Sequence, residues 1–164
     1  MATRYEETSN AWWVWLLYGV SVLFAVIAAY VLCAAIDAEG KEATGLWIVF
    51  AVHAGGAPLM ALLARVFSQY RVMFDGSTLT FGFRTWNKSF GVGEIRSTKT
   101  DHVSLWTFTG AGWRVGRDGR VGYINTFGTA VEVETDARTY CFSCRDPDAL
   151  VRQLRDAGVT GDSN

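Results

Sequence analysis

Charged side chains are absent from two long stretches of this sequence, residues 8–36 and residues 43–64. A soluble fold buries apolar faces at helix or strand periodicity and does not exclude charge over stretches of this length. The distribution argues against a wholly soluble protein and against a disordered one. Basic charge is not in excess either, because 15 Lys and Arg residues are balanced by 16 Asp and Glu residues. The net charge of −1 argues against a dedicated nucleic-acid binder.

Recognisable catalytic motifs are also missing. The sequence has no Ser-His-Asp set with a nucleophile elbow, no H-E-x-x-H, no Walker loop and no carboxylate pair in a recognisable frame. We therefore predict a protein that is not an enzyme and that holds no cofactor and no metal.

Cys141 and Cys144 form a C-x-x-C. A metal site usually needs four ligands, and strand residues three apart point to opposite faces, so we interpret these as ordinary strand-end cysteines. A thiol-redox or metal-dependent enzyme is the least favoured alternative.

The two uncharged stretches are long enough to cross a bilayer as helices. The first, 11–36, measures about 39 Å as a helix and the second, 46–64, about 28 Å, against a hydrocarbon core of about 30 Å. Tryptophans suited to an aromatic belt mark the start of each: Trp12, Trp13, Trp15 and Trp47. The first stretch is too long for a cleaved signal peptide, and acidic residues precede it. We predict a transmembrane helical hairpin at 11–68 with an external loop at 37–45.

Basic residues near the span ends set the expected orientation. The connection between the spans offers one, Lys41, among three acidic residues. The other side offers four: Arg4, Arg65, Arg71 and Arg84. The positive-inside bias therefore predicts a multi-pass protein of the cell membrane with both termini in the cytoplasm. Residues 1–10 are expected to be a cytoplasmic tail.

One ionisable side chain, His53, lies inside the second span. An ionisable group in a membrane span suggests a function, and a neutral imidazole can ligate a haem iron or a chlorophyll magnesium. The sequence offers no partner histidine at a matching depth, so we favour a hydrogen bond to Ser21 or Tyr30, with Pro58 loosening the helix nearby. Small residues recur on both spans and are expected to pack them together. Homo-oligomerisation through one of these faces is the alternative.

After residue 69 the spacing of apolar residues changes to the alternation that is typical of short strands. Residues 70–74 and 77–81, joined by Asp75-Gly76, predict a hairpin. Further strands are expected at 83–87, 94–99, 103–108, 113–115, 121–125, 130–134 and 139–143. Short strands with tight turns are typical of an antiparallel meander that closes as a sandwich or barrel. Asp146 as N-cap and Pro147 at the first helical position predict a closing helix at 147–157, and 159–164 is expected to be a flexible tail.

The end of the chain resembles a known family. The resemblance depends on the segments Gly110–Arg114, Tyr123, Thr129–Glu134, Arg138–Ser143 and Asp146–Leu150. They resemble the last part of bacterial pleckstrin-homology-like domain proteins, many of which carry two membrane spans ahead of the domain. The resemblance covers roughly residues 70–157. It implies an α+β membrane protein whose domain, 69–158, is a strand barrel or sandwich capped by a C-terminal helix, in a family of mostly unassigned role. The first turn, Asp75-Gly76-Ser77, lacks the basic residues of phosphoinositide-binding members, so inositol-phosphate binding is not implied.

A basic cluster gives the remaining candidate site. Arg114, Arg117 and Arg120 surround one predicted turn, and residues 71–120 hold eight basic and four acidic residues. A basic face on the cytoplasmic leaflet gains about 1 kcal/mol per well-placed Lys or Arg from anionic lipid. The three arginines are our candidates for lipid or partner binding, and solvated turn arginines are the alternative.

These observations favour a non-catalytic, membrane-anchored interaction or scaffold module. Its cytoplasmic domain is expected to contact protein partners or the anionic inner leaflet. The alternative is a small accessory subunit of a larger integral membrane complex, bound through the two spans, in which His53 faces a cofactor.

Overall fold

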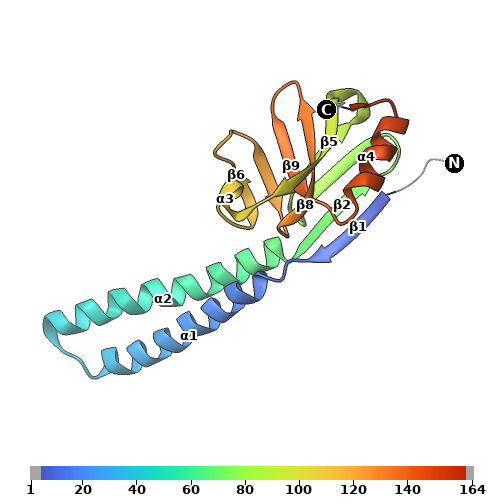
Figure 1. Ribbon diagram of the computed structural model, residues 1–164. Coiled ribbons are helices and arrows are strands. Elements are labelled where there is room, and N and C mark those ends of the chain that lie inside the picture. Colours follow the sequence, from blue (N-terminus) through green and yellow to red (C-terminus); the bar gives the residue numbers. More distant parts are fainter. Residues whose placement is uncertain (1–4, 162–164) are drawn as a thin grey trace. The chain divides into compact units, whose positions relative to one another are not determined.

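The computed structural model describes residues 5–161 (Figure 1). Two compact units make up the chain: residues 12–66, and a β domain formed by the residues up to 11 together with those from 67 onward. The α+β class is confirmed, with two long apolar helices and two sheets. Arg4, used above for the orientation, and residues 162–164 of the expected tail lie outside the described residues.

Two helices form the first unit: α1 (Val14–Ile36) and α2 (Gly40–Phe67). Both are long and apolar enough to cross a membrane. α2 starts six residues before the predicted span, so the expected loop 37–45 is too long and the connection is residues 37–39. Helix-compatible residues follow Gly40, and Glu42 in the first turn complements the helix dipole. α2 runs through Pro58 without a break.

The two helices lie antiparallel and side by side (Figure 1). The Ser21 hydroxyl of α1 donates a hydrogen bond to the Ala57 carbonyl of α2, over 2.8 Å. Near it, the Phe24 ring lies 5.0 Å from the ring of His53. Gly56 makes room for Phe24, because a Cβ atom there would come within 2.4 Å of that ring. Small residues thus let the helices approach closely at this level.

Sheet A is a four-stranded antiparallel sheet in the order β1-β2-β3-β4. Its strands are β1 (Tyr5–Asn10), β2 (Gln69–Phe74), β3 (Thr78–Phe83) and β4 (Trp86–Gly91). The expectation of a mere tail at residues 1–10 is therefore wrong from Tyr5 onward. β1 pairs with β2 from Tyr5 opposite Phe74 to Asn10 opposite Gln69. The segments before α1 and after α2 are thus hydrogen-bonded to each other.

Sheet B has six strands in the order β10-β5-β8-β9-β7-β6. They are β5 (Ile95–Val103), β6 (Gly112–Val115), β7 (Val121–Ile124), β8 (Gly128–Thr135), β9 (Thr139–Ser143) and β10 (Thr160–Gly161). A purely antiparallel meander was the wrong expectation, because β7 runs parallel to β9 and β10 parallel to β5. The β6–β7 hairpin comes between β5 and β8 in sequence but adds to the free edge of β9. The described strands form two separate sheets and no closed barrel.

Aromatic side chains fill the space between the two sheets. The Phe81 ring of β3 stacks on Phe142 of β9 with 4.1 Å between centroids. The buried Tyr70 hydroxyl donates to the carbonyls of Tyr123 and Ser143, the latter over 2.9 Å. These contacts join sheet A to sheet B through one shared core.

Two short helical elements flank β5 in the sequence. The first, η1 (Val92–Glu94), precedes β5, and the second, α3 (Leu105–Phe108), follows it. The predicted strand 103–108 is wrong after Val103. The reason is local, because the Ser104 hydroxyl accepts a hydrogen bond from the Thr107 N–H as an N-cap. Thr109, in the left-handed region at φ 53°, ends the turn.

The closing helix is α4 (Pro147–Asp156), as predicted within one residue. Asp146 caps it by accepting a hydrogen bond from the Ala149 N–H over 3.0 Å. α4 buries Leu150 and Leu154 and packs against β5, β8 and β10. The flexible tail expected at 159–164 is wrong for residues 160–161, which form β10.

Candidate functional site

The structure separates the three arginines that the sequence places in one cluster. Arg114 and Arg117 are exposed, whereas Arg120 is half-buried. The Arg114 guanidinium donates only to the carbonyl of the neighbouring Trp113 among the described residues. The Arg117 side chain forms no hydrogen bond or ion pair within the described chain. Arg120 alone is engaged by other side chains.

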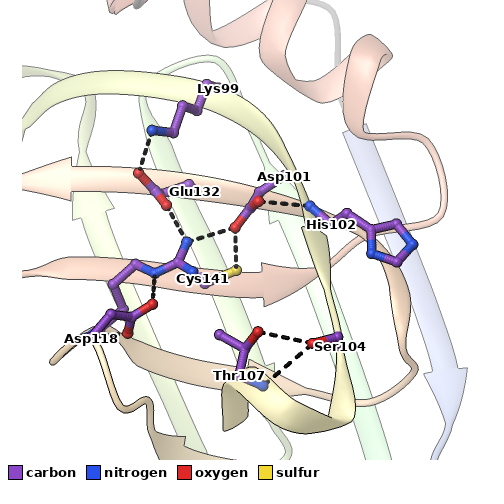
Figure 2. A network of polar contacts seen from close by, with 9 residues as sticks. Lys99, Asp101, His102, Ser104, Thr107, Asp118, Glu132 and Cys141 are labelled. Atoms are coloured by element: carbon purple, nitrogen blue, oxygen red, sulfur yellow. Dashed lines mark hydrogen bonds and ion pairs between the residues drawn. The ribbon is translucent and has the colours of Figure 1, made fainter.

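Arg120 is the centre of an ion-pair network. Figure 2 labels its partners Asp101, Asp118 and Glu132 and marks the contacts with dashed lines. Its Nη1 lies 2.6 Å from Oδ2 of Asp101, and its Nε lies 2.7 Å from Oδ2 of Asp118. The same Nη1 also pairs with Glu132. Lys99 adds a second cation, with Nζ 3.0 Å from the other oxygen of Glu132. Three carboxylates thus share two cations.

Strand register explains why these groups meet. Lys99 of β5 lies opposite Glu132 of β8, which lies opposite Cys141 of β9. Side chains alternate along a strand, so Lys99 and Asp101 share one face of β5. Phe142, next to Cys141, contacts sheet A, so the network lies on the other face. We call this the outer face of sheet B.

An apolar cluster adjoins the network on the outer face. Its buried members are Val103, Phe108, Ile124, Ala130 and Cys141. Phe108, from α3, lies directly over Gly122 of β7, where a Cβ atom would come within 2.6 Å of the ring. The Arg120 guanidinium carbon lies 5.7 Å from the Phe108 ring centroid, within cation–π range. Arg120 therefore covers the edge of this apolar cluster and also pairs with the carboxylates of the network.

The network shifts the pKa values of Asp101, Asp118 and Arg120. Burial alone would raise the pKa of Asp101, but hydrogen bonds from the His102 N–H and from Arg120 lower it below its ordinary value. The pKa of Asp118 is lowered in the same way, mainly by Arg120 against a burial effect of opposite sign. Desolvation works against the charge of Arg120, and its three carboxylate partners outweigh this and raise its pKa. Asp101, Asp118 and Arg120 are therefore ionised and paired at neutral pH. Their ion pairs, with that of Glu132, tie β5, β8 and the β6–β7 turn together.

The two thiols of the C-x-x-C have different partners. Cys141 Sγ donates toward Asp101 Oδ2 over 3.6 Å, while Cys144 Sγ lies 3.1 Å from the Tyr5 hydroxyl of β1. Both cysteines are free, and the described residues contain no cluster of His, Cys, Asp and Glu able to hold a metal ion. Burial raises the pKa of Cys144 to about 11 and that of Cys141 further. Both thiols are protonated at neutral pH, and neither is a reactive thiolate.

His53 does not form the hydrogen bond expected from the sequence. Its Nδ1 lies 2.8 Å from the Val49 carbonyl, one turn earlier in α2, and the expected partner Ser21 bonds to Ala57 instead. A carbonyl only accepts, so Nδ1 carries a proton. Nε2 is then the ring nitrogen that has no hydrogen bond to a described residue. A proton donated to a backbone carbonyl is also the usual arrangement of a metal-ligating histidine.

The turn between β3 and β4 is a feature that our sequence reasoning missed. Its backbone is tied to the start of β2, because the Arg84 N–H donates to the Gln69 carbonyl over 2.9 Å. Exposed Trp86 follows, with its ring 6.0 Å from that of Trp113. Exposed Lys88 completes a basic–aromatic–basic pattern. We call residues 84–88 the basic–aromatic turn. Alternation of these residue types was the signal that was available in the sequence.

A hollow of about 400 Å³ lies on the outer side of sheet A beside this turn. Its polar lining includes Glu6, Gln69, Arg71, Thr80, Arg84 and Asn87. Arg71 and Glu6 pair with each other over 2.7 Å. The hollow therefore carries one basic side chain, Arg84, beyond this balanced pair.

No protein-family model, no curated protein and no solved structure matches this chain. The resemblance to bacterial pleckstrin-homology-like domain proteins therefore stays a prediction.

Proposed function

We propose that the protein is a non-catalytic, membrane-anchored interaction module of the cell membrane. In this proposal α1 and α2 cross the bilayer and hold the β domain at the cytoplasmic surface. The β domain contacts protein partners or the inner leaflet. One observation carries this proposal: two helices of membrane-spanning length are flanked by β1 and β2, and these two strands pair in one sheet.

The surfaces of the helices support the membrane part of the proposal. Large apolar side chains point outward on both, with Trp15 76% exposed on α1 and Ile48 62% exposed on α2. Apolar area of this extent needs an apolar environment. A hydrocarbon core supplies it, and a helix satisfies its own backbone groups there.

The pairing of β1 with β2 supports a topology in which both flanks lie on one side. β1 ends at Asn10, before α1, and β2 begins at Gln69, after α2. Six residue pairs join the two strands. If the helices span the bilayer, hydrogen-bonded strands cannot lie on opposite sides of it. The strand pairing constrains the two flanks independently of the charge bias, which favours the cytoplasmic side.

The chemistry of the β domain favours interaction over catalysis. The carboxylates of the outer face of sheet B are paired with Arg120 and Lys99, and the thiols of Cys141 and Cys144 are protonated. Such groups stabilise a fold but do not activate a substrate at neutral pH. Binding through the exposed faces of the two sheets is the activity that this domain supports best.

The accessory-subunit alternative has one observation in its favour, the tautomer of His53. With Nδ1 hydrogen-bonded to the Val49 carbonyl, Nε2 is the ring nitrogen that has no hydrogen bond to a described residue. Intramembrane ionisable groups are often functional. Purification in mild detergent separates the two candidates, since a stoichiometric, coloured complex favours the accessory subunit. His53→Phe should then bleach that colour.

Cysteine labelling on intact cells tests the proposed topology. Single cysteines are introduced as Glu39→Cys, between α1 and α2, and Ala137→Cys, in the turn before β9, with Cys33→Ser as background. Buried Cys141 and Cys144 stay in place. An impermeant reagent should label position 39 on intact cells and position 137 only after lysis. The reverse pattern contradicts the orientation, and equal labelling of both contradicts the membrane span.

A further inference from the structure

The basic–aromatic turn lies where the chain passes from α2 into the β domain. α2 ends at Phe67, and only Ser68 separates it from β2. The Arg84 N–H fixes the turn to Gln69, the first residue of β2. The turn therefore lies next to the residue that follows the helix. If α2 spans the bilayer, as proposed above, the turn lies at the membrane surface.

Two tryptophans near this turn suit a membrane interface. Trp86 is 51% exposed, and Trp113 of β6 is also exposed with its ring 6.0 Å away. Indole rings combine an apolar body with an N–H donor and collect at the headgroup level of membranes. Trp113 also forms a side-chain hydrogen bond with Tyr123 of β7, which holds its ring in place beside Trp86. The interface region of a bilayer accommodates both parts of the ring.

The basic side chains of the turn lack anionic partners in the described protein. Arg84 and Lys88 are exposed, and neither side chain forms an ion pair or a hydrogen bond with a described residue. Arg71 and Arg120, by contrast, are paired with carboxylates. The cations on either side of Trp86 are therefore available to an external anion.

The hollow beside the turn presents hydrogen-bond donors to such an anion. Arg84 lines it together with the amides of Gln69 and Asn87. Guanidinium groups bind phosphate oxygens through paired, charge-assisted hydrogen bonds. Glu6 at the far side is neutralised by Arg71. These hydrogen-bond donors suit a phosphate group. Because the turn is inferred to lie at the membrane surface, the phosphate group is expected to belong to a lipid.

We propose that the basic–aromatic turn docks on the bilayer that α1 and α2 span. Trp86 and Trp113 enter the interface, and Arg84 and Lys88 bind the phosphate groups of anionic lipids. The proposal rests on the membrane function proposed above and assigns the docking face within it. This face differs from the Arg114–Arg120 turn favoured by the sequence.

The test uses the full chain reconstituted into vesicles that contain a small fraction of lipids with a nitroxide at the headgroup. A fluorophore is attached to Thr85→Cys, at the tip of the turn, in a Cys33→Ala background. Vesicles of phosphatidylglycerol are compared with vesicles of phosphatidylcholine. Strong quenching in anionic vesicles is expected, together with weaker quenching in neutral ones. The control is Ala137→Cys, whose probe should be quenched in neither.

Charge variants identify the groups responsible. Arg84→Gln and Lys88→Gln should each lower the docked-to-undocked ratio in anionic vesicles by about fivefold. The single substitution Arg152→Gln, at an exposed position of α4, removes the same charge and should change nothing. Displacement of the probe by millimolar inorganic phosphate at constant ionic strength would overturn a lipid source in favour of a free phosphate ligand. Equal quenching in the two kinds of vesicle would overturn the role of the charges.

Native Cys33 on α1 provides an independent readout of insertion. A fluorophore on Cys33 should be quenched by lipids with a nitroxide deep in the acyl chain. If Cys33 is quenched but the probes at 85 and 137 behave alike, the docking proposal fails and the membrane proposal stands. If Cys33 is not quenched, the membrane proposal fails and the docking proposal fails with it.

Discussion

Replacing Arg120 with Met should destabilise the β domain strongly, whereas replacing Arg117 with Met should hardly matter. The two arginines are three residues apart in one turn. Arg120 pairs with Asp101, Asp118 and Glu132, and Arg117 pairs with no described side chain. The comparison therefore separates a structural arginine from a solvated one within the same local sequence.

The magnitude follows from what each carboxylate loses. Glu132 is the most buried partner, with a side chain 14% exposed, and it keeps only Lys99. Asp101 keeps the His102 N–H. Leaving such groups short of one partner costs about 1–3 kcal/mol, and exposed Asp118 adds little. The contact with Phe108 adds about 0.5–1 kcal/mol.

We therefore expect a loss of about 3 kcal/mol in the free energy of unfolding for Arg120→Met. For a domain of about 100 residues this lowers the melting temperature by about 10–20 °C. Arg117→Met should stay within about 0.5 kcal/mol of the native chain. The measurement is thermal unfolding of the full chain in detergent, followed by near-ultraviolet circular dichroism of the aromatic core.

Equal melting temperatures for the two variants would refute this reasoning. Such a result would mean that the carboxylates of the outer face are satisfied by water when Arg120 is absent. A second variant makes the test specific. Adding Asp101→Asn to Arg120→Met should recover part of the loss, because it removes a charge left without its partner.

Three further outcomes are expected in the same thermal assay. Gly122→Ala should cost about 1–3 kcal/mol, since its Cβ atom would meet Phe108 at 2.6 Å, and adding Phe108→Leu should cost less than the two changes summed. Asp146→Ala should cost about 1 kcal/mol through loss of the α4 N-cap, and no loss would contradict the cap. The lowered pKa values of Asp101 and Asp118 stabilise the fold above their ordinary value near 4, and this contribution is lost as the pH falls through the folded values. Asp101→Asn should make the acid transition shallower.

Elements with strong local signals were predictable from the sequence. The Asp75-Gly76 hairpin, the two apolar helices and α4 with its Asp146 cap all appear near their expected positions. Each depends on a period or a turn within a few residues. Pattern reasoning works best where the determinants are adjacent in the chain.

β1 and sheet B depend on partners that are distant in sequence. Tyr5–Asn10 has one partner strand, β2, which follows two complete helices. The residues 103–108 are β-branched and aromatic enough to resemble a strand, but the Ser104 cap converts their second half into α3. The place of β7 beside β9 is set by an open sheet edge, which local patterns do not encode.

In the candidate site too, nearby residues were predictable from the sequence, whereas contacts between distant residues were not. Sequence proximity grouped Arg114, Arg117 and Arg120, but the direction of each side chain determines its partners. Only Arg120 reaches the face on which Asp101 and Glu132 meet, and that meeting depends on strand register. The basic–aromatic turn was visible in the sequence, but its position beside Gln69 depends on the pairing of β2 with β3.

The pairing of β1 with β2 makes the helical hairpin an insertion in the loop of a β-hairpin. Asn10 and Gln69 are opposite each other, and residues 11–68 form the loop between them. Every residue between two strands that pair over their whole length belongs to the loop of their hairpin. The helical unit is therefore an insertion at a single site of the β domain, and the segments that enter and leave it are hydrogen-bonded to each other.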